Sequence, residues 1–576
     1  MLRASSLRAR LSGCVTLVAL AAALAGCGSS SGGGTAADPA SAVPASAVIY
    51  AGATVRPTGT QSTAALAAGK ALTHQADPYL RLLAILQTPG SPQLNYQREL
   101  APWLGAHAGI FLTSLSSSSS ALLSLVEHGL LGSSSSAAFP FATAGAQGAI
   151  VLDTTNAAKA LSFLDAQAKH AGAHASSYKG VAFQTNSSGV AFGMVDRFAV
   201  IGSESGLRSV IETTHGASSL ASASAYAKLL ASAPPSALAH LYTSSPSSTN
   251  ASAPEEASSL LALLAGTREA NISVVSSASS LALDADTLSA SASASSSSGG
   301  GLLAVSPEGA QALSELPGES WLAVGLGHVG TTLNQDVSGL TSLLSTVTTL
   351  GGAGPESSGG LSLNGLLQGL TSPLSALASN SALAKRDFTS WMGSAGIFAS
   401  GGSLLELKGG VVIASKDPAR SRAAVAELAA QLRKAGAATA PASIPGSEAA
   451  VAARITGLPV VLDIAAGRDP AGQSKFVLGI GEASVEDALH PASTLSASAT
   501  RSAAASALGE GTQPSIIVEL PTVLTLLESI GLTEAPSISK FVPYLRSITS
   551  LAAGGRDLSS EVQRFRLVLG LQSAGG

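Results

Sequence analysis

The sequence predicts an α+β fold of two tandem pseudo-repeat domains, each a mostly antiparallel sheet with helices packed on it. Three observations support this. Short strand-like runs alternate with helical stretches, five segments recur in the same order in both halves, and a Ser/Ala/Gly-rich segment separates the halves. Paired strands with interspersed helices favour a sheet covered by helices on one face. We therefore predict a first repeat over 41–288, a linker over 289–313 and a second repeat over 314–574.

The recurring segments are short but collinear. Residues 43–52 align with 316–325, and Trp103-Leu104-Gly105 aligns with Trp391-Met392-Gly393. Three further matches follow in the same order, at 148–151 with 410–413, 198–204 with 476–482 and 218–220 with 493–495. Because repeats fix architecture, five matches in order predict an internal duplication.

Hydrophobic periodicity places the elements of each half. Runs at 47–55, 108–113 and 149–153 are typical of strands. Residues 156–171 have the spacing of a helix, with Thr155 as the expected N-cap.

Two further signals concern turns and helix starts. Asp417-Pro418 is expected to open the equivalent helix of the second half. Asp196-Arg197 predicts a tight hairpin between 190–195 and 198–201, followed by a helix from Glu204 to Glu212.

Composition excludes several classes of protein. The 576 residues are 46% hydrophobic, 11% charged and 4% aromatic, and the mean hydropathy is +0.36. Disorder of the whole chain is excluded by this hydropathy. Nucleic-acid binding is not expected, because 31 basic and 35 acidic residues give a net charge of −4. A polytopic membrane protein is also excluded, because no second apolar run approaches the roughly 20 residues needed to span a bilayer.

The N-terminus indicates export and lipid attachment. Arg3, Arg8 and Arg10 precede an apolar stretch at 15–25, which is typical of a signal peptide. The stretch ends in Leu24-Ala25-Gly26-Cys27, which resembles the lipobox of bacterial lipoproteins. We predict a lipoprotein signal peptide over 1–26, lipidation of Cys27, and a flexible Gly/Ser tether over 27–40. The protein would then be anchored to the outer face of the bacterial cytoplasmic membrane by the lipid on Cys27.

Cysteine usage agrees with this prediction. The two cysteines are Cys14, inside the predicted signal peptide, and Cys27, consumed by the lipid. The exported body would have no thiol for a disulfide, a metal site or catalysis.

Several motifs suggest chemistry, and each has a simpler explanation. Residues 325–330 match a dinucleotide-binding glycine pattern, but no carboxylate follows in 345–353, so glycines at a strand end explain them better. The G-x-S-x-G match at 28–32 lies in the tether and is rejected as a nucleophile elbow. His170 and His174 have metal-ligand spacing, but Gly172 interrupts the helix, which favours a solvated helix end. The other histidines are scattered: His74, His107, His128, His215, His240, His328 and His490.

Carboxylates are the remaining candidates for catalysis. Asp284 and Asp286 lie two apart, on one face of a predicted strand, and we expect a charged solvent face. Glu204 and Glu482 occupy equivalent positions at helix starts, where a carboxylate favours the helix dipole without catalysis.

One segment of the first half has no equivalent in the second. Residues 112–147 include about 25 extra residues with an apolar stretch at 121–131. The stretch either packs on its own domain or forms an exposed arm that meets a partner or the membrane.

The segments quoted above resemble a family of bacterial, largely actinobacterial, lipoproteins catalogued as domain of unknown function 3352. The resemblance rests on the opening at 44–52, the strand–helix unit at 148–171 and Tyr178-Lys179-Gly180-Val181 before the 196–211 hairpin and helix. It implies an extracytoplasmic location and a duplication, and it implies no activity, substrate or catalytic residue.

We therefore predict a non-enzymatic binding or envelope-structural protein with an unknown protein or lipid partner. No catalytic, cofactor-binding or metal-binding residue is assigned. Two alternatives remain open: a carrier of an apolar ligand, and an envelope hydrolase whose site is assembled in space.

Overall fold

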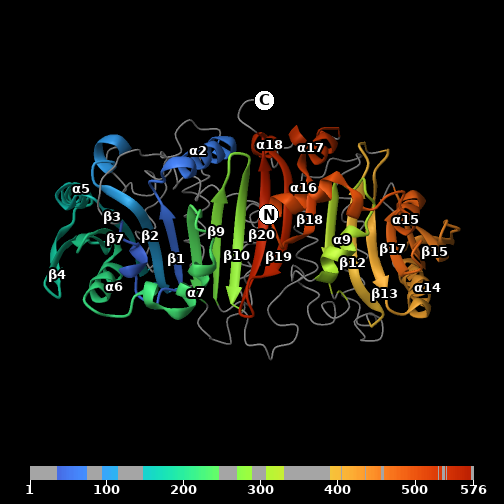
Figure 1. The fold of residues 1–576 in the computed structure, drawn as a ribbon, viewed down its shortest axis with the longest axis horizontal. Coiled ribbons are helices and arrows are strands. Elements are labelled where there is room, and N and C mark those ends of the chain that lie inside the picture. Colours follow the sequence, from blue (N-terminus) through green and yellow to red (C-terminus); the bar gives the residue numbers. More distant parts are fainter. Residues whose placement is uncertain are drawn as a thin grey trace. The chain divides into compact units, whose positions relative to one another are not determined.

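The computed structural model describes residues 36–73, 94–114, 147–244, 269–288, 307–327, 329, 390–403, 405–434, 436–455, 460–529, 531–534, 539 and 541–572. Contacts divide the chain into two compact units (Figure 1). Unit 1 is Met1–Ala292 with Asp557–Arg564 and Leu571–Gly576, and unit 2 is Ser293–Arg556 with Phe565–Gly570. Both units contain helices and antiparallel strands, so the α+β prediction is confirmed.

The described strands of unit 1 pair antiparallel in the order β4-β5-β6-β7-β3-β2-β1-β8-β9-β10. Their bounds are β1 (Ile49–Thr54), β2 (Leu104–Ser114), β3 (Gln147–Thr154), β4 (His174–Tyr178), β5 (Val181–Thr185), β6 (Val190–Val195), β7 (Phe198–Ser203), β8 (Ala239–Ser244), β9 (Glu269–Ser276) and β10 (Ser280–Leu288). The helical elements are η1 (Pro39–Ser41), α2 (Gly59–Thr73), η2 (Tyr96–Leu100), α5 (Ala157–His170), α6 (Glu204–Thr214), η3 (Leu220–Ser222) and α7 (Ser224–Ser232). The strands predicted at 47–55, 108–113 and 149–153 are all present.

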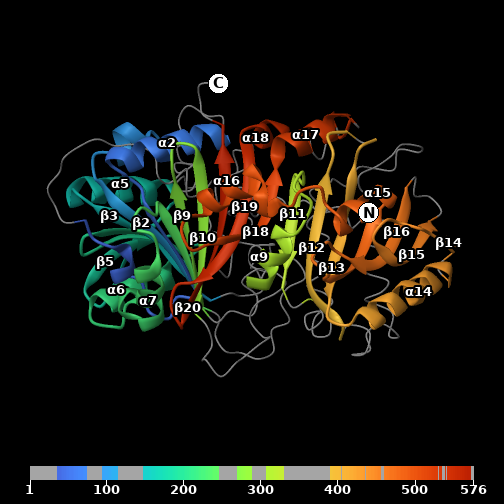
Figure 2. The same cartoon turned by 45° about the vertical axis from the view of Figure 1, so that its right-hand side comes forward.

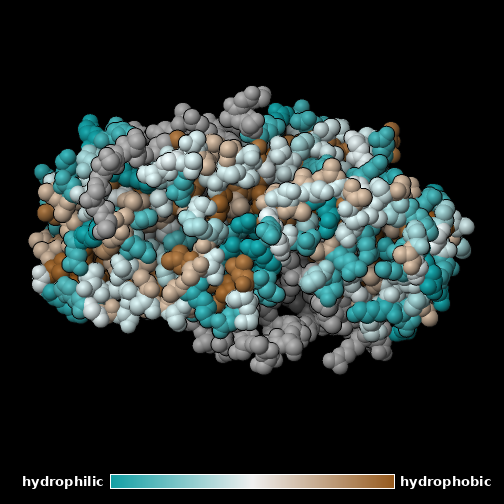
Figure 3. Space-filling model, in the orientation of Figure 1, coloured by the Kyte–Doolittle hydropathy of each residue, from teal (hydrophilic) through white to brown (hydrophobic). Residues whose placement is uncertain are grey.

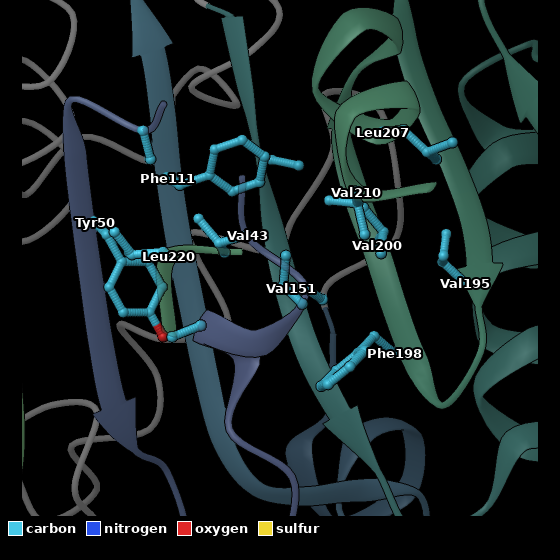
Figure 4. Close-up of a cluster of buried hydrophobic side chains, with 14 of the residues drawn as sticks. Val43, Tyr50, Phe111, Val151, Val195, Phe198, Val200, Leu207, Val210 and Leu220 are labelled. Atoms are coloured by element: carbon cyan, nitrogen blue, oxygen red, sulfur yellow. The ribbon is translucent and has the colours of Figure 1, made fainter. Parts of the chain in front are cut away.

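The centre of the unit 1 sheet, at β3, is buried on both faces. Ile150 and Leu152 of β3 belong to a hydrophobic cluster with α5, whereas Ala149 and Val151 belong to a second cluster with α6 (Figure 4). Helix α5 lies on one side of the strands, and α6 and α7 lie on the other (Figure 2). The prediction that helices cover one face was wrong. Because consecutive strand residues point to opposite faces, the unbroken apolar run 149–152 needs cover on both.

The predicted hairpin and the helix after it are confirmed. Val195 of β6 pairs with Phe198 of β7, and Asp196 in the turn has a φ of 50°. Helix α6 begins at Glu204, as predicted, and the Ser203 hydroxyl caps it by accepting a hydrogen bond from the Gly206 N–H at 3.0 Å.

The N-cap of α5 differs from the prediction by one residue. Asn156 Oδ1 accepts a hydrogen bond from the Lys159 N–H at 3.1 Å and caps the helix. The hydroxyl of Thr155, the predicted cap, instead donates to the Trp103 carbonyl oxygen at 3.1 Å.

The described strands of unit 2 pair antiparallel in the order β14-β15-β16-β17-β13-β12-β11-β18-β19. Their bounds are β11 (Leu322–Leu326), β12 (Met392–Ser400), β13 (Lys408–Ser415), β14 (Ala438–Pro441), β15 (Ser447–Arg454), β16 (Val461–Arg468), β17 (Ser474–Ile480), β18 (Gln513–Glu519) and β19 (Ile548–Asp557). The helical elements are α9 (Pro307–Ser314), α14 (Pro418–Lys434), α15 (Glu482–Leu489), η4 (Leu495–Ala497), α16 (Ala499–Leu508), α17 (Leu520–Ser529), η5 (Leu532–Glu534) and α18 (Val542–Arg546). As predicted, Asp417 opens α14, and its side chain accepts hydrogen bonds from the Ala419 and Arg420 N–H groups.

The ends of the predicted segments are more structured than expected. Helix α9 occupies the last residues of the predicted linker, and η1 lies at the end of the predicted tether. Residues 557–564, before and at the start of the last strand, β20 (Val562–Leu571), group with unit 1, which a simple tandem division does not predict. The signal peptide and Cys27, residues 115–146 of the insertion, and residues 289–306 of the linker lie outside the described residues.

The surface is polar without being highly charged. On the face shown in Figure 3, pale and teal residues predominate, and the brown ones form small groups. Within the part of the chain that the structure describes, the exposed large hydrophobic side chains are Leu161, on α5, and Leu405.

Helix α5 offers a matched test of its packing. The Leu164 side chain is 1% exposed and Leu161 is 47% exposed. We expect Leu164→Ala to reduce the free energy of unfolding by about 2–5 kcal/mol, because it leaves a cavity against the sheet. Leu161→Ala should change it by less than about 0.5 kcal/mol. Urea unfolding followed by circular dichroism would measure both, and equal effects would contradict the assignment of the buried face.

Candidate functional site

Two glycines lie side by side near the middle of the unit 1 sheet. Gly52 of β1 pairs with Gly109 of β2, and His240 of β8 pairs with Gly52 from the other side. A Cβ atom on Gly52 would lie 2.6 Å from His240 Cε1, and one on Gly109 would lie 2.7 Å from Tyr50 Cε2. Both distances are too short for a real Cβ contact, so these positions need glycine to make room for the two rings.

Aromatic rings from three elements fill this space. Tyr50 of β1 and Tyr226 of α7 have ring centroids 5.9 Å apart at 76°, and Tyr226 and Tyr242 of β8 are 5.2 Å apart at 88°. Aromatic pairs favour such edge-to-face geometry. The His240 ring lies 5.6 Å from the Tyr50 ring, and its Nε2 shares a hydrogen bond of 3.0 Å with the Tyr226 hydroxyl.

A pocket of about 210 Å³ opens beside these rings. Its polar side chains are those of Asp38, Tyr50, Thr54, His107 and His240. The rest of its lining is small or apolar: Pro39, Gly52, Ala53, Ala108, Ala237 and Leu238. Because a cavity of about 150 Å³ can hold benzene, a molecule of one ring fits this volume.

The Tyr50 hydroxyl is buried and makes no hydrogen bond of good geometry with the described residues. Burial is the main cause that raises the pKa of Tyr50 well above its usual range. Tyr226 and Asp38 act in the same direction, and the nearby Ala40 N–H opposes them. The hydroxyl therefore stays protonated, and a buried hydroxyl without a partner costs about 1–3 kcal/mol.

His240 is a neutral imidazole at neutral pH. Burial lowers its pKa from 6.5 to about 4, with a smaller contribution from His107 and an opposing one from Asp38. Burial also raises the pKa of Tyr242 to about 12 and that of Tyr226 further. Tyr50 and His240 are thus uncharged at neutral pH, and Asp38 is an exposed acidic residue among those that line the pocket.

Polar side chains continue from the pocket across three strands. In register, Tyr242 of β8 pairs with Asn271 of β9, and Asn271 pairs with Asp286 of β10. One row further, His240 pairs with Ser273, and Ser273 pairs with Asp284. We call these six residues the polar band.

The polar band corrects one prediction. Asp284 and Asp286 lie on the same face of a strand, as the spacing predicted, but both are 0% exposed, so the expectation of a charged solvent face was wrong. The two aspartates can be buried because a cation that is remote in the sequence neutralises them.

That cation is Arg564, at the start of β20 in unit 1. Its Nε and Nη2 donate to the two oxygens of Asp286 at 2.7 and 2.8 Å, and its Nη1 lies 3.5 Å from Asp284 Oδ2. Nη2 also donates to the Ser232 carbonyl oxygen at the end of α7. Burial alone lowers the pKa of Arg564, but its bond to Asp286 and the charges of both aspartates outweigh this and raise the pKa. This group is a structural ion pair closed to solvent.

Unit 2 also has a pair of cross-strand glycines, and these are covered in another way. Gly325 of β11 pairs with Gly396 of β12. A Cβ on Gly325 would lie 1.9 Å from the Gly309 carbonyl oxygen of α9, and one on Gly396 would lie 2.6 Å from Leu316 Cδ2. Where Tyr50, Tyr242 and Asn271 stand in unit 1, register places Ala323, Ile517 and Ala552 in unit 2, all buried and apolar.

The other sequence candidates are not brought together. His170 ends α5 and His174 begins β4, with Gly172 between them at a φ of 65°. Glu204 pairs with Arg208 one helical turn later. Glu482 begins α15, and burial, followed by the negative charge of Glu482, raises the pKa of buried Asp463. The glycines at 325–327 lie at the end of β11, as the simpler explanation predicted.

The described residues contain neither a metal-binding cluster nor a membrane-spanning helix. No group of three or more His, Cys, Asp or Glu residues is arranged to hold a metal ion. No helix there is long and apolar enough to cross a bilayer.

Sequence reasoning treated His107 and His240 as scattered and overlooked Tyr50, Tyr226 and Arg564. A weak signal was present, because Tyr50 and Gly52 alternate on one face of a strand, as do His240 and Tyr242. That these two strands are neighbours becomes visible only in the fold.

The fold and the pocket define an α+β protein with a small, polar-lined pocket in one of its two units. The chain belongs to a family described as "Protein of unknown function (DUF3352)", whose model matches residues 11–571. The family resemblance found in the sequence is thereby confirmed. No curated protein and no solved structure matches the chain.

Removing Arg564 should destabilise unit 1. Arg564→Met leaves two buried carboxylates without their cation, so we expect the free energy of unfolding to fall by about 3–5 kcal/mol. Changing Asp284 and Asp286 to Asn in the same chain should recover part of this loss. Urea midpoints of the three proteins would measure it. If Arg564→Met unfolds at the wild-type midpoint, the ion pair does not stabilise the unit.

His240 should make stability depend on pH. Its pKa in the folded chain is about 4, below the unfolded value of 6.5, so the unfolded state gains a proton first as pH falls. Stability from the neutral imidazole is complete above pH 6.5, declines towards pH 4 and is lost below it, by up to about 3 kcal/mol. In His240→Gln, the decrease in unfolding free energy between pH 7 and pH 4 should be smaller by this amount. Equal decreases in the two proteins would contradict the neutral assignment of His240.

Proposed function

We propose that this protein is a lipid-anchored, extracytoplasmic binding protein, built from two copies of one α+β unit, that does not catalyse a reaction. The observation that carries the binding role is the pocket of unit 1. There, polar side chains surround a single-ring volume, and the Tyr50 hydroxyl lacks a partner among the described residues.

The location is supported by the N-terminal sequence. Three arginines, an eleven-residue apolar stretch and Leu24-Ala25-Gly26-Cys27 stand in the order that lipoprotein signals have. Two acyl chains on one cysteine would give stable membrane attachment without a spanning helix.

The duplication is supported by the matching order of elements. In both units a strand with a central glycine pairs with a second strand that also carries glycine (Gly52 with Gly109, Gly325 with Gly396). Helices α5 and α14 then correspond, as do α6 and α15, and the strand orders agree from β4 and β14 through β9 and β19. Isolated bridges join Pro44 to Ser219 and Pro317 to Thr494 at equivalent places.

Binding is better supported than hydrolysis. A hydrolytic site needs a nucleophile activated by an adjacent base. Among the described residues, the hydrogen bond that joins a histidine side chain to a hydroxyl is that of His240 with Tyr226. Because burial raises the pKa of Tyr226, its hydroxyl is a poor nucleophile.

The carrier alternative is less well supported. A pocket for a sizeable apolar ligand usually measures about 300–1,000 Å³ and is mostly apolar. The pocket of unit 1 measures about 210 Å³ and has five polar side chains in its lining.

The anchor has a direct test. In cells fed a labelled fatty acid, the wild-type protein should incorporate label and fractionate with membranes. Cys27→Ser should lose the label and leave the membrane fraction, because the acylated side chain is gone. Cys14→Ser, in the predicted signal peptide, is the matched control and should retain the label. Label that persists in Cys27→Ser would refute lipid attachment at this residue.

A further inference from the structure

We propose that the unit 1 pocket binds one neutral, hydroxyl-bearing molecule the size of a single sugar ring, and that the chain has one such site. The inference rests on the binding role proposed above and assigns that site its ligand class. It follows from which hydrogen-bonding groups of the pocket lack partners, from the charge of its lining and from the difference between the two units.

Tyr50 requires an acceptor in its ligand. Its hydroxyl is buried and has no hydrogen-bond partner among the described residues, so the hydroxyl hydrogen has no acceptor there. A ligand oxygen that accepts this hydrogen would remove the cost of a buried, unpaired donor.

Asp38 offers an acceptor to a donor group of the same molecule. Its Oδ1 accepts from the Ala40 N–H at 2.9 Å, and it is an exposed residue of the pocket lining. An anion would be repelled by Asp38, and none of the described lining residues is Lys or Arg to offset that repulsion. A simple ammonium ion offers donors alone and would leave the Tyr50 hydrogen unpaired. A hydroxyl group both donates and accepts, so a molecule with several hydroxyls meets both requirements.

The shape of the pocket agrees with a ring-shaped polyol. The partly exposed His240 ring provides a flat surface in the lining, and the negative face of an aromatic ring attracts C–H hydrogens. Thr54 and His107 add groups that can donate or accept hydrogen bonds at the sides. A volume of about 210 Å³ is sufficient for one sugar ring and too small for a chain of them.

Unit 2 explains the expected stoichiometry. The space above its glycine pair is taken by α9, whose Gly309 and Leu313 press against Gly325. A helix backbone in this position leaves no room for a ring, so we expect one site in each chain.

The test is calorimetric titration of the purified full chain with D-glucose, D-galactose and myo-inositol. Because the protein is proposed to be membrane-anchored, a parallel titration uses vesicles that contain a neutral monoglycosyl diacylglycerol. Benzoate and benzylammonium serve as charged molecules of similar size. We expect saturable binding of at least one polyol or of the glycolipid, with one molecule per chain. Binding of a free polyol identifies a soluble ligand, and binding of the vesicles alone identifies a lipid headgroup.

Three variants localise the binding. Tyr50→Phe keeps the ring and removes the hydroxyl, and should weaken binding by about tenfold. Asp38→Asn keeps the oxygen that caps η1 and tests the exposed lining without disturbing the core, and we expect about fivefold weakening. Tyr178→Phe removes a hydroxyl that bonds Glu212 outside the pocket lining and should bind like the wild type.

The possible results distinguish the proposed ligand class from its alternatives. No saturation with any polyol or glycolipid, tighter binding of benzoate or benzylammonium, two molecules per chain, or wild-type affinity in both Tyr50→Phe and Asp38→Asn would overturn the inference. Cys27→Ser should still bind a soluble polyol, so failure of the anchor and failure of the pocket would be distinguishable.

Discussion

The site depends on one constraint, which is that other groups must pack closely against a pair of cross-strand glycines. Where two neighbouring strands both lack side chains, whatever covers them must come within contact of the backbone. In unit 1, side chains from two strands and a helix meet this need, and flat rings leave a pocket beside them. In unit 2, the backbone of α9 at Gly309 packs directly against Gly325. The same strand pattern thus supports an open site in one unit and a closed surface in the other.

The polar band shows what such a site requires of its surroundings. Asp284 and Asp286 could not stay ionised away from water without a bound cation, because desolvation of a charge is costly. Arg564 supplies it from 278 residues away. Unit 1 is therefore incomplete until the last part of the chain has been made, although its other described strands end at Leu288. The two aspartates stay buried because Arg564 pairs with both, and Arg564 is itself bonded to the end of α7.

Local patterns predicted the local structure well. The Asp196 hairpin, the start of α6 at Glu204 and the Asp417 cap depend on a few adjacent residues, and these were read correctly. The sequence analysis did not predict that helices cover both faces of β3, although the unbroken apolar run of this strand indicated such burial. The site was not predictable in the same way. Asp284 looked like a surface residue because its partner is remote in sequence, and His240 looked isolated because its neighbours come from β1 and α7.

Cys27 and Asp38 are close together in the sequence, and this affects how the protein would encounter its ligand. Asp38, which lines the pocket, stands eleven positions after the proposed acylated cysteine, a reach of at most about 40 Å when fully extended. The proposed tether would confine the encounter to a thin shell above the bilayer, where a headgroup can reach an effective concentration in the millimolar range. Under the proposed anchoring, weak intrinsic affinity would suffice for occupancy at the membrane, while the same molecule diluted in the medium would rarely be bound.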